Sequence, residues 1–133
     1  MIGIWSIPMS VRVPGNNVQL KRAYEPPSPD DGARILVDRL WPRAISKETL
    51  ALDDWMKDIA PSAQLRRWFG HDPERWQEFC RRYAAELREH EDVLSELRLR
   101  ARKGRITLVF SARDETHNDA VALRSFILHG LMH

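Results

Sequence analysis

Hydrophobic positions recur along this chain in two different periods, and together they predict strands separated by helices. Apolar residues alternate with polar ones over 18–24, which predicts a first strand. The stretches 34–38 and 105–110 carry nearly continuous apolar runs instead, the pattern of strands buried on both faces of a parallel sheet. Between these strands, and after the last of them, the period changes to that of helices.

The clearest helical segment follows Asp72 and Pro73, an N-cap residue and a proline at the first helical position. Its apolar side chains recur at i, i+3, i+4, i+7, i+8 and i+11, at Trp76, Phe79, Cys80, Tyr83, Ala84 and Leu87. We therefore expect one buried face that includes Phe79, with Glu78 and Arg82 exposed on the other side.

Four further helices are predicted, over 46–50, 62–69, 92–102 and 116–129. The first two begin at Ser46 and Ser62, whose hydroxyls can accept a hydrogen bond from a free amide of the first turn. Residues 54–60 fit either a helix tail or a short strand. The proline- and aspartate-rich residues 26–32 are expected to form a loop.

This order of strands and helices predicts an α/β fold, a small, mostly parallel sheet with helices packed on its faces. A length of 133 residues fits one domain, which we assign to residues 17–133. Residues 1–16 show no helical or strand period and are expected to be a peripheral N-terminal extension. We expect deletion of residues 1–8 to change the melting temperature little.

Charge and cysteine content limit the partners and the compartment. Lys and Arg number 21 against 19 for Asp and Glu, and the net charge of only +2 argues against a nucleic-acid partner. The single cysteine, Cys80, cannot form an internal disulfide, which favours a reducing compartment. The sequence shows no signal-peptide pattern and no membrane-spanning run, so we expect a cytoplasmic protein that does not bind membranes.

Six segments carry a recognisable family pattern: Lys21–Tyr24, Leu36–Arg43, Ala60–Ser62, Leu65–Phe69, His71–Asp72 and Ser111–Asp114. They resemble the YeaO-like proteins, a domain of unknown function (number 488), over roughly residues 18–128. The resemblance implies a small bacterial cytosolic protein, and it supplies neither a reaction nor a cofactor. One departure is Ala44, where the family pattern has glycine, and this implies a different turn or modest strain.

Polar residues follow both of the apolar strands. Asp38 and Arg39 come after the first strand, and Ser111 through Asp114 come after the second. Because ligands of open α/β sheets bind beyond the carboxyl ends of parallel strands, we expect these groups to share one edge. Arg39 and Arg43 would bind a carboxylate or phosphate there, and Trp41 would wall the pocket or stack on a flat ligand.

A structural role competes with this ligand site. Asp38 and one of the two arginines could form a buried ion pair that fixes the loop at Trp41 and Pro42. In both cases we expect Arg39 or Arg43 to lie within hydrogen-bonding range of a strand-end carboxylate, because two unpaired carboxylates would repel each other.

The start of the last predicted helix supplies the candidate acid/base groups. Asp114 and His117 are spaced so that the carboxylate can orient the imidazole, and Asn118 beside them is a candidate ligand-binding residue. The alternative is that Asp114 or Thr116 only caps the helix and that His117 is exposed.

No nucleophile stands out among the remaining polar residues. Ser62 and Ser111 join the candidate ligand-binding residues by position alone. Asp72, beside His71, is explained as a helix cap, so no metal site is predicted. Cys80 lies on an apolar helix face and is expected to be a buried, unreactive thiol.

Two functional hypotheses follow. The first is a domain that binds an anionic or polar small molecule at the strand ends, with acid/base chemistry by Asp114 and His117 left open. The second is a non-catalytic binding or regulatory module that contacts nucleic acid or a protein through arginine-rich helix faces. A concave polar pocket at the strand ends would favour the first, and a flat basic face the second.

Overall fold

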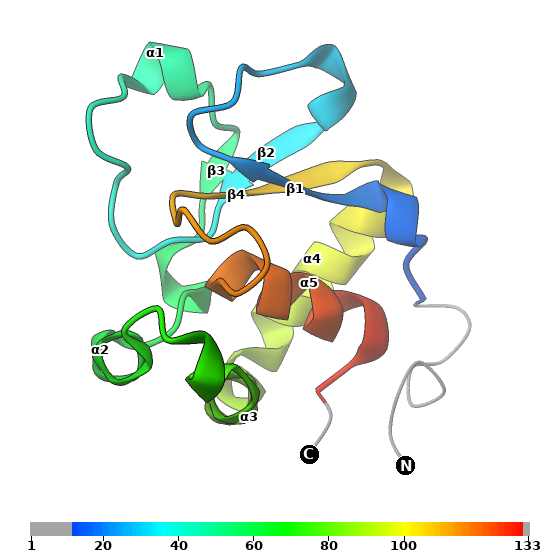
Figure 1. The fold of residues 1–133 in the computed structure, drawn as a ribbon. Helices are drawn as coiled ribbons and strands as arrows, with labels where there is room; N and C mark the ends of the chain where they lie inside the picture. Colours follow the sequence, from blue (N-terminus) through cyan, green and yellow to red (C-terminus); the bar gives the residue numbers. More distant parts are fainter. Residues whose placement is uncertain (1–11, 132–133) are drawn as a thin grey trace.

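The structure is a computed structural model that describes residues 12–131 (Figure 1). Most of the expected N-terminal extension therefore lies outside the described residues, and the dispensability of residues 1–8 stays a prediction. Val13, from the part of the extension that is described, is buried in the main core.

The described residues form a sheet of four parallel strands in the order β1-β4-β2-β3. The strands are β1 (Val18–Arg22), β2 (Ala33–Leu36), β3 (Asp54–Trp55) and β4 (Ile106–Phe110). The parallel arrangement predicted from the apolar runs is confirmed. β4 pairs with β1 on one side and with β2 on the other, and all five of its residues are buried.

Residues 54–60 form a short strand followed by a single turn. The two-residue strand β3 adds to the edge of the sheet beside β2, and a single 3-10 turn, Lys57–Ile59, follows it. Of the two alternatives left open by the sequence, the short strand is the one formed.

Five α-helices are described: α1 (Lys47–Leu50), α2 (Ala63–Phe69), α3 (Trp76–Leu87), α4 (Glu91–Lys103) and α5 (Asp119–His129). The predicted caps at Ser46 and Ser62 are confirmed, because each hydroxyl accepts a hydrogen bond from the amide three residues on. Gly70 ends α2 with φ 55°, the left-handed conformation that glycine adopts readily.

The last helix begins later than predicted. Its N-cap is Asn118, whose Oδ1 accepts a hydrogen bond from the amide of Val121 at 2.9 Å. The prediction that Asp114 or Thr116 caps this helix is wrong, because residues 114–117 form a separate turn ahead of it. Residues 114–119 are all polar, so the local sequence does not show which of them starts the helix.

The buried face of α3 is confirmed. Phe79 and Tyr83 are 2% and 1% exposed, and Phe79 stacks on Phe69 of α2 with ring centroids 4.4 Å apart. Arg82 is exposed as expected, whereas Glu78 is partly covered where it binds Arg81 and Arg82.

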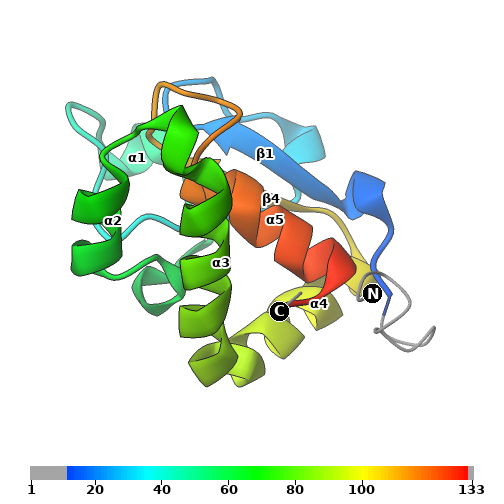
Figure 2. The same cartoon turned by 60° about the horizontal axis from the view of Figure 1, so that its bottom comes forward.

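The sheet separates two apolar clusters. The main core lies between the sheet and the helices α3, α4 and α5, which lie on one side of it (Figures 1 and 2). The smaller cluster lies on the other side, beneath α1, and consists of Ala23, Leu36, Leu50 and Val109 with Trp41 and Trp55 packed against it. Helices therefore cover both faces of the sheet, with α3, α4 and α5 on one face and the short α1 on the other.

A buried ionic network lies beside the smaller cluster. Asp31, only 1% exposed, binds Lys21 of β1 at 3.0 Å and Arg34 of β2 at 2.7 Å. Arg34 also donates to the carbonyl oxygen of Leu50 at 2.8 Å. These contacts tie the loop over 26–32 to the sheet.

None of the helices formed by residues 12–131 is long and apolar enough to cross a membrane.

Candidate functional site

A cavity of about 1060 Å³ opens at the carboxyl ends of the strands. Its walls come from the residues after β1, the loop after β2, helix α2 and the connection from β4 to α5. Because the strands are parallel, the connections after β2 and β4 leave the sheet at the same edge (Figure 1). The cavity therefore lies in the position where open α/β sheets hold their ligands.

Six of the nine residues predicted for the site line this cavity: Asp38, Trp41, Arg43, Ser111, Asp114 and Asn118. Arg39, Ser62 and His117 are not part of its lining. Arg39 Nε donates instead to the carbonyl oxygen of Pro61 at 3.4 Å. Ser62 caps α2, and its hydroxyl donates to Glu86 at 2.6 Å.

Asp114 and His117 lie together, but their geometry is that of a turn. The Asp114 carboxylate accepts hydrogen bonds from the amides of Thr116 and His117, at 2.9 and 3.0 Å, and lies 3.0 Å from His117 Nδ1. These bonds, the Thr116 amide first, lower the pKa of Asp114 to about 2. The His117 ring packs edge-on against Trp76, with centroids 5.3 Å apart, rather than lining the cavity.

Asp38 and Asp119 form a carboxyl pair at the point where β2 ends and α5 begins. Asp38 Oδ2 accepts hydrogen bonds from the amide and the hydroxyl of Ser111, at 2.9 and 2.8 Å. The carboxyl of Asp119 lies beside that of Asp38 in the wall of the cavity. Burial, and then the negative charge of Asp38, raise the pKa of Asp119 well above that of an ordinary carboxyl. Asp119 therefore keeps its proton at a pH where an isolated aspartate has lost it.

The cavity is lined by five arginines, Arg22, Arg43, Arg66, Arg67 and Arg113. Within residues 12–131, none of the five forms an ion pair with a carboxylate. Only Arg22 uses its guanidinium in hydrogen bonds, to the carbonyl oxygens of Ala112 at 2.9 Å and Ser111 at 3.3 Å. The side chains of the other four line the cavity and form no hydrogen bond or ion pair with the described residues.

The expected ion pair at the strand ends is not formed. Neither Arg39 nor Arg43 lies within 4.0 Å of a carboxylate among the described residues. The raised pKa of Asp119 lowers the repulsion between Asp38 and Asp119 instead, and the positive charge of Arg66 contributes more weakly. The buried ion pair that competed with the ligand site is therefore absent from this part of the chain.

Sequence reasoning missed Asp119, Arg22, Arg66 and Arg67 as residues of this site, whereas Arg113 lies within the group 111–114 expected at this edge. Asp119 is an acidic residue in the first turn of a helix, where acidic residues are common for purely structural reasons. Arg22 could have been found, because β1 also ends at this edge once the sheet is parallel. Arg66 and Arg67 carried no signal, since the position of α2 over the strand ends depends on tertiary packing.

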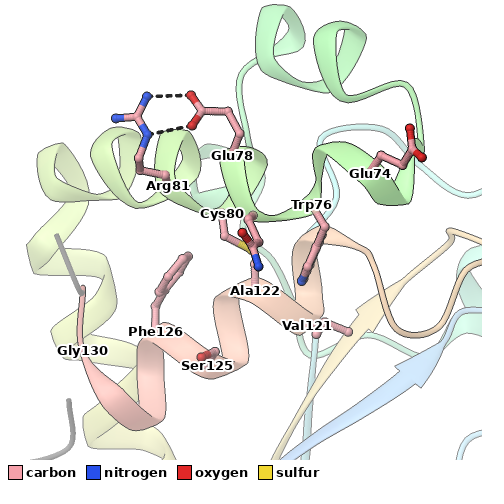
Figure 3. Close-up of a pocket in the computed structure, with 11 residues that line it drawn as sticks. Glu74, Trp76, Glu78, Cys80, Arg81, Val121, Ala122, Ser125, Phe126 and Gly130 are labelled. Carbon is pink, nitrogen blue, oxygen red and sulfur yellow. Dashed lines mark hydrogen bonds and ion pairs between the residues drawn. The ribbon is translucent and has the colours of Figure 1, made fainter. Parts of the chain in front are cut away.

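A second hollow of about 730 Å³ lies between α3 and α5 (Figure 3). Cys80 of α3 faces Ala122 of α5 across it, and Phe126 lines it farther along α5. On its rim the Glu78 carboxylate accepts two hydrogen bonds from Arg81, at 2.8 and 2.6 Å. This hollow is lined by polar and apolar side chains, and its cationic group, Arg81, is already paired.

Cys80 is half-buried rather than fully buried. Burial raises the pKa of its thiol to about 11, so the thiol stays protonated at neutral pH. This agrees with the unreactive thiol expected from its place on the apolar face of α3. Within residues 12–131, no three His, Cys, Asp or Glu side chains gather closely enough to hold a metal ion.

Comparison with known proteins identifies the family. Residues 17–133 match the family described as "Inactive DUF488-N3 subclade". This range contains every segment that lines the strand-end cavity. The chain belongs to this family.

Among curated proteins, the chain is similar to "Uncharacterized protein YeaO" of Escherichia coli, with 45% identity over 111 residues, which are 84% of this chain and 96% of that protein. An uncharacterized protein of Mycobacterium tuberculosis is 41% identical over 110 residues, or 83% of this chain and 92% of the relative. The YeaO-like resemblance seen in the motifs is confirmed. No solved structure gives a significant match.

The departure from the YeaO-like pattern at Ala44 is visible in the backbone. Ala44 has φ 57°, the left-handed conformation that favours glycine. This positive φ is the backbone conformation in which alanine carries the modest strain that the departure implied. The hydroxyl of Tyr24 donates to the carbonyl oxygen of Arg43 at 2.9 Å, which holds the loop against the residues after β1.

Proposed function

We propose that this domain binds an anionic small molecule in the strand-end cavity and does not catalyse a reaction on it. The observation that carries the proposal is the set of five arginines in one concave site without an ion-pairing carboxylate. Guanidinium groups pair with phosphate or carboxylate through two parallel hydrogen bonds, and these pairs are strong where water is partly excluded. A cavity of about 1060 Å³ accommodates a ligand of ordinary metabolite size.

Binding without catalysis is supported by the placement of the candidate acid/base groups. His117 packs on Trp76 outside the cavity lining, and Asp114 is held as a strongly acidic carboxylate by its own turn. A general base needs to reach the proton that it removes, and a carboxyl with a pKa of about 2 is a weak base. The description of the matching subclade as inactive supports the same conclusion.

The rival hypothesis of a basic helix face receives less support. Arg81 and Arg82 of α3 both bind Glu78, and Arg100 of α4 binds Asp54 at 3.3 Å. Arg98 donates to carbonyl oxygens at the end of α5. Arg66 and Arg67 belong to the strand-end cavity, which leaves Arg102, exposed on α4, too isolated to form a basic face.

Calorimetric titration with inorganic pyrophosphate at low salt tests the proposal. Arg43 and Arg66 line the cavity from the loop after β2 and from α2. We expect Arg43→Ala and Arg66→Ala each to weaken pyrophosphate binding about ten- to hundredfold, because each removes a charge-assisted contact of about 1.5–3 kcal/mol. Higher salt should weaken binding to the wild-type protein as well.

Arg102→Ala is the matched control, because Arg102 is exposed on α4 and is not part of the cavity. It should bind pyrophosphate as the wild-type protein does. The proposal is wrong if pyrophosphate does not bind at millimolar concentration, or if all three variants bind it equally well.

A further inference from the structure

The carboxyl pair is the part of the cavity that an anion alone does not explain. Asp38 and Asp119 line the same cavity as the five arginines. A site that bound only phosphate would be weakened by two carboxyl groups in its wall, since like charges repel. A second kind of ligand group is needed to account for them.

Hydroxyl groups of a ligand are suited to form hydrogen bonds with the Asp38–Asp119 carboxyl pair. A carboxylate accepts hydrogen bonds from two hydroxyls at once, and a protonated carboxyl adds one donor. One oxygen of Asp38 is already used by the amide and hydroxyl of Ser111, which fixes the orientation of the group. In dinucleotide-binding sheets, an acidic side chain near a strand end likewise accepts a hydrogen bond from a ribose hydroxyl.

A metal ion or an ammonium group fits this position less well. The described residues supply no third ligand of the kind that a metal ion needs at this pair. The surrounding guanidinium groups make the cavity unfavourable for any cation. A neutral polar group does not suffer from this repulsion.

The size and the apolar walls of the cavity indicate a ligand larger than an inorganic anion. Pockets for drug-sized ligands measure roughly 300–1,000 Å³, far more than one inorganic anion needs. Tyr24 and Leu40, 45% and 63% exposed, and the half-buried Trp41 line the cavity with apolar surface. Such surfaces pack against the carbon face of a sugar or against a flat ring.

We infer that the ligand is a phosphorylated sugar, free or as part of a nucleotide, whose hydroxyl groups bind the Asp38–Asp119 carboxyl pair while its phosphate binds the arginines. This inference rests on the proposed function, because it assigns the anion to the same arginines. It adds a prediction about hydroxyl groups that the proposed function does not make.

The test compares ligands that differ only in hydroxyl groups. Adenosine 5′-monophosphate and its 2′,3′-dideoxy analogue are titrated into the full chain, with ribose 5-phosphate and pyrophosphate in parallel. We expect the hydroxylated nucleotide to bind at least about tenfold more tightly than the dideoxy analogue. Tight binding of ribose 5-phosphate would identify a free sugar phosphate as sufficient, and binding of the nucleotide alone would identify the base as a further requirement.

The variant Asp119→Ala should reduce this preference to within about twofold while pyrophosphate still binds, which also shows that the variant is folded. Should that variant not fold, Asp119→Asn keeps the volume and removes the carboxyl group, and it should reduce the preference at least about threefold. The control Asp92→Asn, on the exposed start of α4, should leave the preference unchanged.

The outcomes separate the two proposals. Pyrophosphate binding without any hydroxyl preference, or a preference that survives both Asp119 substitutions, would overturn the sugar inference and leave the anion site standing. Failure of all four ligands to bind would overturn the anion site and the inference together.

Discussion

Ala44 holds a backbone conformation that glycine adopts at lower cost, and this makes a single-residue prediction. A left-handed conformation costs an L-residue roughly 1–2 kcal/mol, and glycine avoids this cost. The greater flexibility of glycine in the unfolded chain offsets about 0.5–1 kcal/mol of the resulting stabilisation. We expect Ala44→Gly to stabilise the protein by about 0.5–1 kcal/mol. Thermal unfolding followed by circular dichroism would show a raised melting temperature.

Ala85→Gly is the matched control for this substitution. Ala85 is exposed in the middle of α3, where glycine costs about 1 kcal/mol relative to alanine. The same chemical change should therefore lower the melting temperature there. A lower melting temperature for Ala44→Gly as well would contradict the assignment of strain to Ala44.

Residues that act through their neighbours were the hardest to predict from sequence. Asp38 and Ser111 were placed correctly, because each directly follows a buried strand and the parallel rule brings them together. Asp119 was not, since its proximity to Asp38 depends on how α5 meets the end of β2. No property of positions 117–120 in the sequence distinguishes that contact from an ordinary helix start.

At the scale of elements, α3 carries the largest share of aromatic packing in the main core. Phe79 stacks on both Phe69 and Trp76, with centroids 4.4 and 5.6 Å apart. We expect Phe79→Ala to cost about 3–5 kcal/mol of unfolding free energy, measured by urea denaturation. Leu99→Ala, at a position 47% exposed on α4, should cost less than about 1 kcal/mol. Similar losses at both positions would mean that Phe79 is not a core residue.

Local sequence signals predicted the ends of the helices well. They did not predict contacts between residues that are far apart in the sequence. Ser46, Ser62 and Gly70 were assigned correctly as caps, because a cap is a contact within three or four residues. Asp31 was read only as a loop residue, although it is 1% exposed and binds Lys21 and Arg34. Those partners lie on two strands that are not adjacent in the sheet, so the sequence gives no sign of the contact.

The carboxyl pair should shape how the stability of the whole molecule depends on pH. The folded state raises the pKa of Asp119, so between its unfolded and folded pKa values the folded protein binds the proton more tightly. Stability from this group is therefore fully present below about pH 4 and is lost as pH rises through the folded pKa. We expect Asp119→Asn, which does not titrate, to gain stability relative to the wild-type protein as pH rises, by at most about 1.4 kcal/mol per pH unit.

Urea denaturation from pH 4 to 8 measures this difference, and Asp114→Asn supplies a control of opposite sign. The pKa of Asp114 is lowered to about 2, so its contribution is present above its unfolded pKa and is lost as pH falls. Asp114→Asn should therefore be less stable than the wild-type protein at neutral pH. Parallel pH profiles for the wild-type protein and Asp119→Asn would contradict the raised pKa of Asp119.

At the scale of the whole molecule, the edge of the sheet that carries the site was predictable, because the parallel arrangement of the strands determines it. Once residues 34–38 and 105–110 are parallel strands, their ends and the groups that follow must meet. The rule does not say which helix covers that edge. Arg66 and Arg67 reach the cavity only because α2 packs on α3 through Phe69 and Phe79, a contact set by side-chain shape.

The central place of β4 has a consequence for how the chain acquires its fold during synthesis. β4 is the last of the described strands, and it lies between β1 and β2, so within residues 12–131 β1 pairs with no other strand. During translation β1 and β2 emerge long before residues 106–110, and β1 must wait without a partner. Closure of the sheet is a late event with a high contact order, which slows folding. A ribosome-bound chain that ends before β4 would leave the apolar side of β1 exposed to chaperones.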